Sequence, residues 1–155
     1  MARRKKFKVS IGDIFTIPFN QELKAIGQVV LQGATSDVFI IFDCIYKENE
    51  MLNKIQNQPI LFMFNTIDTR LEDGEWQIIG NDRPPKNLAL KNYISETLDG
   101  YVVLDAGGQI IRGATENDVK SLSNLSSISP EIVEDAVKAK FGNGEWYPYL
   151  DKLLY

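Results

Sequence analysis

The sequence predicts an α+β fold, mostly antiparallel β-structure followed by short C-terminal helices. Residues 7–112 contain several short runs rich in Val, Ile, Phe and Tyr, separated by turn residues, which is typical of strands. Residues 113–155 instead carry apolar residues at helical spacing behind helix-capping residues. We expect a single domain whose sheet is either curled or closed into a small SH3-like barrel, because 155 residues fit one hydrophobic core.

Short strands are expected along the first third of the chain. Residues 7–11 alternate apolar and polar side chains, and the Gly-Asp pair that follows turns the chain into a second apolar segment at 14–19. Residues 24–32 predict a longer strand, in which Gly27 marks a bulge or bend. Residues 37–46 are apolar on both faces and therefore predict a buried, central strand.

Two further strands are expected at 59–64 and 75–80. The segment between them, 68–74, ends in Asp-Gly, a strong hairpin signal, so we expect an exposed hairpin tip there. The polar residues 47–57 indicate a loop or a helical turn before these strands, and a proline-stiffened loop follows them at 81–87.

A hairpin and two helices are expected in the last third of the chain. Residues 101–105 and 109–112 flank a Gly-rich turn and predict the hairpin. Thr115, followed three residues later by an aspartate, predicts an N-cap and a short helix. A second helix is expected to begin after Ser129, because proline and then an acid follow it, and to end at Gly142.

The composition restricts the chemistry open to this protein. It has 44% hydrophobic residues, enough for a globular core, but one cysteine and no histidine. Histidine is the usual general base near neutral pH and the commonest metal ligand, so Ser-His-Asp catalysis and most transition-metal sites cannot be built. Cys44 has no disulfide partner and lies among apolar neighbours. We therefore expect a protein that is not an enzyme and that holds no metal or cofactor.

Charge is unevenly distributed along the chain. The net charge is −4, yet five basic residues lie within the first eight positions. The remaining residues include twelve basic and 21 acidic ones, a balance of −9. An acidic body repels nucleic acid and favours a basic protein partner. We expect residues 1–6 to form a disordered basic tip, ahead of a β-rich body at 7–112 and a helical part at 113–155.

The sequence carries no recognisable export or membrane signal. The basic start is not followed by the apolar run of about 7–15 residues that a signal peptide needs. The longest apolar runs, 38–42 and 60–64, are far shorter than the roughly 20 residues of a membrane span. We therefore expect a cytoplasmic protein without a membrane partner, in a compartment where a single reduced cysteine is common.

One acidic stretch is a candidate binding surface. Four carboxylates against Arg70 alone lie within eight residues, beside a tryptophan. Clustered acid steers a basic partner and an aromatic ring supplies contact area, but a solvated hairpin tip with a core tryptophan explains the same pattern. The candidate partner-binding residues are the acids and the tryptophan of this stretch and one later aspartate: Asp68, Glu72, Asp73, Glu75, Trp76 and Asp82. The aromatic residues at 146–149 and Tyr155 either extend this surface or seal the sheet.

Four segments of the chain together resemble one protein family. They are the Gly-Asp-hydrophobic-Phe and Ile-Pro sequence at 11–18, the strands at 27–30 and 38–43, and the Gly-x-Trp-x-Ile-Ile-Gly sequence at 74–81. Over about residues 8–90 the chain resembles the immunity proteins numbered twenty-six in bacterial polymorphic toxin systems. The resemblance implies a mostly β intracellular protein that binds and neutralises a toxin domain, usually encoded beside it. The family has no established catalytic residues to transfer, and the C-terminal third lies outside the resemblance.

Three functions are compatible with these observations. The favoured hypothesis is an immunity protein that blocks its cognate toxin C-terminal domain through an acidic surface, which would suit a basic nuclease. One alternative is a small-barrel RNA-binding protein or endoribonuclease, although nucleic acid is an unfavourable partner for an acidic body. Another is a regulatory or scaffold module unrelated to any toxin.

Overall fold

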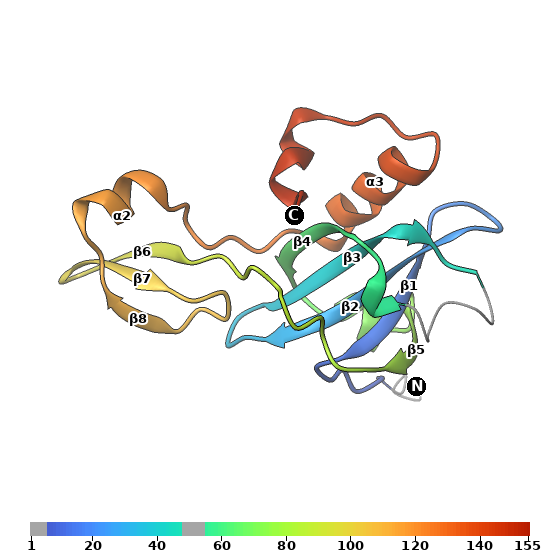
Figure 1. The fold of residues 1–155 in the computed structure, drawn as a ribbon, viewed down its shortest axis with the longest axis horizontal. Helices are drawn as coiled ribbons and strands as arrows, with labels where there is room; N and C mark the ends of the chain where they lie inside the picture. The colour runs from blue at the N-terminus through green and yellow to red at the C-terminus, as the bar shows by residue number, and fades with distance from the viewer. Residues whose placement is uncertain (1–5, 48–54) are drawn as a thin grey trace, which may run out of the picture.

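The computed structural model describes residues 6–47 and 55–155 and has the α+β fold expected from the sequence (Figure 1). Its larger sheet is antiparallel, with the strand order β4-β3-β2-β1-β5. Since β4 and β5 form its two edges, the sheet stays open and the closed small barrel does not form. The strands of this sheet are β1 (Asp13–Pro18), β2 (Lys24–Gln32), β3 (Asp37–Ile45), β4 (Ile60–Thr66) and β5 (Gln77–Asn81).

The two long strands β2 and β3 lie inside the sheet, and for β3 this is the central position that its apolar residues on both faces predict. The β2–β3 register shifts between Ala25 and Gly27, which is the bulge expected at the glycine. A Cβ atom on Gly27 would lie 2.6 Å from the Ile40 carbonyl oxygen and 2.7 Å from Phe15 Cζ. The neighbouring strand and a core ring therefore pack where any other side chain would stand.

The segment between β4 and β5 is not a hairpin, because β5 pairs with β1 at the opposite edge of the sheet. The edges of a five-stranded sheet are roughly 19 Å apart, and the chain covers this span through the short helix α1 (Thr69–Glu72). Leu71 of this helix is fully buried. Gly74, with φ of +76°, lies just beyond the helix. The hairpin tip expected at 68–74 is therefore wrong.

The strand expected at 7–11 does not form either. Residues 6–10 have no regular secondary structure. The Phe7 main-chain N–H donates to the Glu72 carbonyl oxygen at 2.9 Å, so this segment lies along the end of α1. The side chain of Val9 packs in the core, which explains one of the apolar positions that alternate with polar ones at 7–11. Of the disordered basic tip expected at 1–6, residues 1–5 lie outside the described residues, whereas Lys6 is described and pairs with Glu72.

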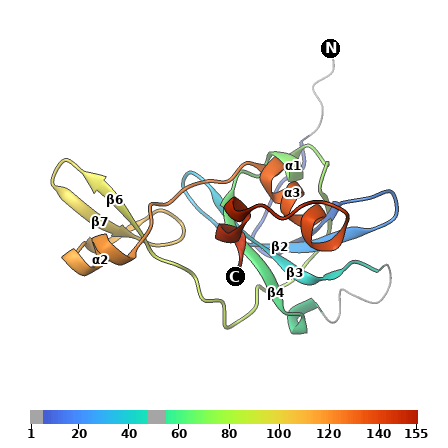
Figure 2. The same ribbon diagram turned by 90° about the horizontal axis from the view of Figure 1, so that it is seen from above.

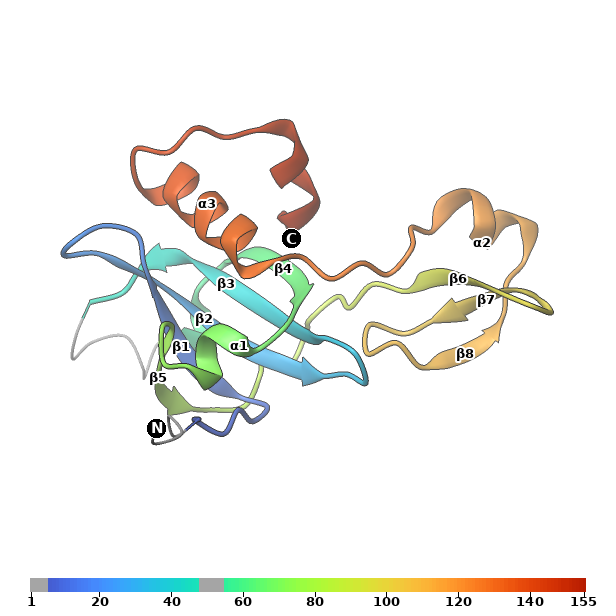
Figure 3. The same cartoon turned by 180° about the vertical axis from the view of Figure 1, so that it is seen from behind.

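One face of the larger sheet is covered by the helices α3 (Pro130–Phe141) and η2 (Pro148–Leu153) (Figures 1 and 3). We call it the helix-covered face. Aromatic rings dominate the contact, with Phe15 and Trp76 stacked at a centroid distance of 5.6 Å. The opposite face packs against η1 (Ile55–Asn57) and against residues of the connector that follows β5.

The helix α3 begins and ends where the sequence predicts. Ser129 is the N-cap of α3, although its side chain makes no capping bond, and Gly142 follows the last turn. Trp146 stacks on Phe62 of β4 at 5.9 Å, and Leu150 of η2 is fully buried. Trp146 and the leucines of η2 therefore seal the sheet, whereas Tyr147, Tyr149 and Tyr155 are exposed. Over the described ranges, no helix is long and apolar enough to cross a membrane.

Residues 93–121 form an arm that extends beyond the end of the larger sheet (Figures 1 and 2). The expected hairpin is present, and one further strand, absent from the sequence-based expectation, pairs with it. Thr115 and Asp118 form the expected capping box. The elements of the arm are β6 (Tyr93–Thr97), β7 (Gly100–Leu104), β8 (Ile110–Gly113) and α2 (Glu116–Ser121).

Candidate functional site

Four of the five candidate acids gather around α1. Two lie at its ends, and two lie between the helix and β5. The first turns of α3, which lies beside α1, add two glutamates that the sequence did not single out (Figure 2). We call these six carboxylates the acidic surface: Asp68, Glu72, Asp73, Glu75, Glu131 and Glu134.

Arg70 joins α1 to α3 at the centre of the acidic surface. Its Nη2 lies 2.9 Å from Glu131 Oε1 and 3.3 Å from Glu134 Oε1, and its Nε lies 3.2 Å from Glu75 Oε2. A second cation, Lys6, lies with its Nζ 3.3 Å from a Glu72 oxygen. Three carboxylates therefore share one guanidinium, so these pairings leave the surface with excess negative charge.

Asp68 and Glu72 lie close together, and their pKa values are shifted in opposite directions. Burial, followed by the hydrogen bond and charge of Glu72 and the charge of Asp37, raises the pKa of Asp68 to about 6. The pKa of Glu72 is lowered by its hydrogen bonds with Asp68 and Lys6. Glu72 is therefore the stronger acid of the pair, and Asp68 keeps its proton to a higher pH.

Trp76 belongs to the hydrophobic core. Its side chain is 0% exposed, stacked on Phe15 and tilted against Phe39. Its Nε1–H donates to Glu134 Oε2 at 3.4 Å, which satisfies the buried indole. The burial of the ring agrees with the core interpretation that the sequence left open, and Trp76 also lines a pocket together with Phe7 and Gly74.

Asp82 lies apart from the other candidate acids. It follows β5, whereas Glu75 precedes it, and a five-residue strand separates the two by about 17 Å. Its main-chain N–H donates to the Gly12 carbonyl oxygen at 3.0 Å, and its carboxylate accepts from the Arg83 N–H at 2.8 Å. Asp82 is thus tied to the loop before β1 and is not part of the acidic surface.

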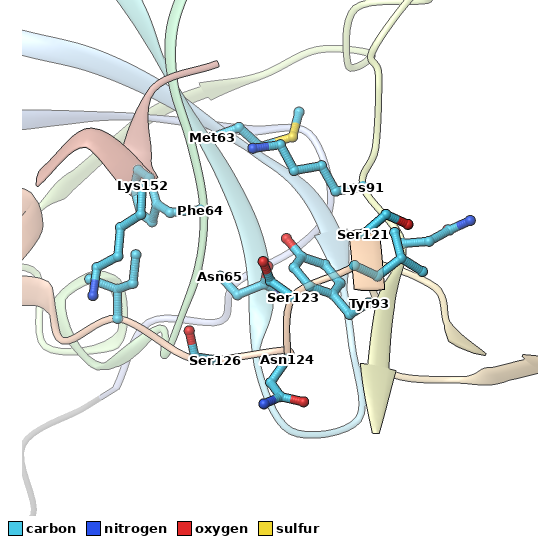
Figure 4. A pocket seen from close by; sticks show the side chains of 13 residues that line it. Met63, Phe64, Asn65, Lys91, Tyr93, Ser121, Ser123, Asn124, Ser126 and Lys152 are labelled. Atoms are coloured by element: carbon cyan, nitrogen blue, oxygen red, sulfur yellow. The ribbon is translucent and has the colours of Figure 1, made fainter. Parts of the chain in front are cut away.

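A groove of about 520 Å³ lies between β4 and the arm (Figure 4). We call it the junction groove. Its lining includes Lys91 and Lys152, three serines and one asparagine from residues 121–126, and no carboxylate within the described parts of the chain. Burial raises the pKa of Tyr93 in this lining. The groove thus has the opposite charge character to the acidic surface, and its residues come from segments too far apart for any sequence pattern to indicate.

The described residues contain no group of three or more carboxylate or cysteine side chains placed to hold a metal ion. Among the described residues, no cation lowers the pKa of Cys44. Burial and, to a lesser degree, the charge of Asp43 raise the pKa of its thiol to about 11, which disfavours the thiolate that a nucleophile needs.

The Gly-Asp motif before β1 has a structural role in the turn that leads into this strand. Gly12 has φ of +91°, and a Cβ there would lie 2.4 Å from the Asp82 carbonyl oxygen. The buried Asp13 carboxylate accepts from the Ser10 N–H at 2.8 Å and from Asn81 Nδ2 at 2.9 Å. The motif therefore fixes the turn into β1 and its junction with β5, as a structural interpretation of these residues predicts.

A family model described as Immunity protein 26 matches residues 10–102, well over half of the chain. The matched segment holds all five strands of the larger sheet and runs into β7 of the arm. No curated protein and no solved structure matches the chain. Together with the motifs placed above, the match shows that this chain belongs to the Immunity protein 26 family.

Proposed function

We propose that this chain is a non-catalytic inhibitor that works in the cytoplasm. It binds the toxin domain encoded beside it and neutralises that domain by protein–protein contact. Membership of an immunity-protein family supports the general role. The observation that carries the mode of binding is the acidic surface, where six carboxylates from α1, its flanks and α3 surround two cations.

An acidic surface on this scale suits a basic toxin. Clustered carboxylates steer an oppositely charged partner and raise its association rate. Nuclease domains carry basic surfaces where they hold the phosphate backbone, so an acidic inhibitor takes the place of the nucleic acid there. We therefore propose a basic nuclease domain as the toxin.

The two alternative functions have less support. A small-barrel endoribonuclease would need a closed barrel, but the larger sheet is open. It would also need an RNA-attracting face, whereas the exposed residues around α1 are acidic. A scaffold module unrelated to toxins is disfavoured by the family to which the chain belongs.

The proposal is tested by growth rescue. The C-terminal domain of the protein encoded immediately upstream is expressed with and without this chain. We expect growth arrest by the upstream domain alone and restored growth when both are present. Arrest that this chain leaves unchanged would refute the pairing. Growth arrest caused by this chain alone would instead favour the endoribonuclease.

Charge reversal tests the acidic surface. The double variant Asp73→Lys and Glu75→Lys should weaken binding of the toxin domain about tenfold at low salt and flatten the salt dependence of the dissociation constant. Titration calorimetry at two ionic strengths measures both effects. The control variant Glu96→Lys and Asp99→Lys changes the net charge equally at exposed positions of the arm and should leave binding unchanged. Equal losses in the two variants would contradict a local role for the acidic surface.

A further inference from the structure

We propose that a pocket beside α1 receives one long basic side chain, an arginine or a lysine, from the toxin domain. This inference rests on the proposed function, because it names the chemistry of the partner group at the acidic surface. The basis is geometric: an apolar pocket the size of a side chain lies beside residues that carboxylates flank in the sequence, and one of these carboxylates, that of Asp73, has no ion pair or hydrogen bond within the described residues.

The pocket lies between the N-terminal segment, α1 and the start of β5. Its volume is about 270 Å³, and its lining residues are Phe7, Leu71, Gly74, Trp76, Gln77 and Ile78. All but the glycine and the glutamine carry large apolar side chains. The floor is rigid, since Leu71 and Trp76 belong to the hydrophobic core of the helix-covered face.

Phe7 forms the outer wall of the pocket. Its main-chain N–H donates to the Glu72 carbonyl oxygen, which holds the segment against α1. A Cβ atom at Gly74 would lie 2.9 Å from Phe7 Cε2, so the ring rests directly over the glycine. The Phe7 side chain is nevertheless 58% exposed, which leaves part of the ring available to a partner.

The size of the pocket favours a single side chain over a free small molecule. Small-molecule sites usually measure about 300–1,000 Å³, and this pocket lies below that range. A buried anchor residue that enters such a pocket is the usual centre of a protein interface. Three carboxylates of the acidic surface directly neighbour lining residues in the sequence, so the anchor and the steering charges would belong to one contact.

The charges at the rim decide which side chain enters. Glu72, Asp73 and Glu75 are sequence neighbours of the lining residues. Glu72 already pairs with Lys6, and Glu75 pairs with Arg70. Within residues 6–47 and 55–155, the Asp73 carboxylate has neither an ion pair nor a hydrogen bond, and its residue is exposed.

A long basic side chain satisfies both parts of this site. Lysine and arginine bury an aliphatic stem on apolar surface while their charged head stays at the polar edge. The stem would occupy the pocket and the head would lie at Asp73. An arginine head can also stack on the exposed Phe7 ring. An acidic side chain would meet three carboxylates, and a purely apolar one would leave Asp73 without a partner and partly desolvated.

The first test measures affinity for the toxin domain identified by growth rescue. Phe7→Ala should weaken binding about tenfold because it removes the wall of the pocket. Asp73→Asn should weaken it about fivefold and reduce its salt dependence. The double variant should lose less than the product of the two effects, because both act on the same inserted side chain. Matched controls are Tyr101→Ala and Asp99→Asn, also at exposed positions. A double variant within twofold of the unchanged chain would overturn the assignment.

The second test does not need the toxin, which separates this inference from the proposed function. N-acetyl-arginine amide is titrated into the full chain, and the amide resonances of Gly74 and Gln77 are followed by NMR. We expect saturable shifts that Asp73→Asn abolishes and that N-acetyl-norleucine amide does not reproduce. No preference for arginine over norleucine would overturn the pocket assignment, even if the toxin binds. Arginine-specific shifts without any toxin binding would support the pocket and refute the proposed function.

Discussion

The carboxyl group of Asp68 sits at the start of α1 in a place that disfavours its charge. It is half-buried, close to Glu72, and within the electrostatic influence of Asp37, so its pKa rises to about 6. Burial contributes most, since removing a carboxylate from water penalises the ionised form. At neutral pH the folded chain therefore holds this carboxylate in its less favourable state.

Replacing Asp68 with asparagine should stabilise the fold in a pH-dependent way. A raised folded-state pKa means that the folded chain binds more protons than the unfolded chain between pH 3.8 and about 6, so stability falls as pH rises through this window. Asp68→Asn should increase the free energy of unfolding by about 1 kcal/mol at pH 7.5, after allowance for solvent screening, and by much less at pH 4.

Urea unfolding at the two pH values measures this difference. Asp99→Asn, at an exposed position of the arm, is the control and should change stability at neither pH. An equal gain for Asp68→Asn at both pH values would show that the buried charge is not the cause.

At the residue scale, local spacing predicted the part of the acidic surface that lies within a few residues of α1. It could not predict the partners of Arg70, because Glu131 and Glu134 are 61 and 64 residues away and reach it only through the packing of α3. The same long-range packing buries Trp76. A tryptophan beside a cluster of acids has the same local sequence whether its ring faces solvent or the core.

Among the elements, η2 contributes more to the core than its length indicates. Leu150 and Leu153 are fully buried in the helix-covered face, and the Tyr155 N–H donates to the Leu61 carbonyl oxygen at the edge of β4. We therefore expect Leu150→Ala to cost about 2–5 kcal/mol of stability, the usual effect of truncating a buried leucine. Chemical denaturation with fluorescence detection measures the change.

The matched control for this prediction is Tyr149→Ala, one residue away. Tyr149 is 49% exposed and stacks on the exposed ring of Tyr147. It should lose less than about 1 kcal/mol. Similar losses at the two positions would mean that η2 acts through its helical backbone and not through its buried leucine.

Elements with a local chemical signature were predicted, and those set by tertiary pairing were not. The capping box of α2 and the proline at the start of α3 are local features, and both helices begin where expected. The Asp-Gly pair at 73–74 was misleading because a left-handed glycine follows a helix as readily as it forms a hairpin turn. β6 was missed because its Tyr-Ile-Ser-Glu-Thr sequence has no apolar run and depends on β7 for its ladder.

Across the whole molecule, the arm has far fewer buried residues than the larger sheet. The arm buries only Ile94, Val103 and Ala106 among its described residues, and all four residues of β8 are exposed. It contacts the sheet through its β7–β8 turn, where the Ala106 carbonyl oxygen accepts from Asn65 Nδ2 at 3.0 Å. We expect the arm to open in local fluctuations while the sheet stays folded.

Native-state hydrogen exchange tests this expectation. Amides of β7 and β8 should exchange with a lower free energy of opening than those of β2 and β3, which should require global unfolding. A denaturant series separates the two, because global exchange depends on denaturant and local exchange does not. A common, denaturant-dependent free energy for both groups would show that the chain opens as one unit.

The family match ends at residue 102, yet much of the cover of the helix-covered face lies beyond it. Val133, Val137 and Leu150 pack there against β-strand residues such as Phe39 and Phe62. The matched segment alone would expose these rings to water. Any relative built on the same sheet must therefore supply an equivalent cover, from its own C-terminal chain or from another protein.

The two indole rings of the chain lie in different surroundings, so intrinsic tryptophan fluorescence can distinguish them. Trp76 is sealed in the core with its N–H bound to Glu134, whereas Trp146 is only half-buried, with its N–H bound to Asp151. A dissolved collisional quencher should reach Trp146 and spare Trp76, so the unquenched, blue-shifted emission belongs to the ring that borders the pocket beside α1. A partner side chain in this pocket should change the intensity or wavelength of the Trp76 emission, so binding can be followed without a label on either molecule.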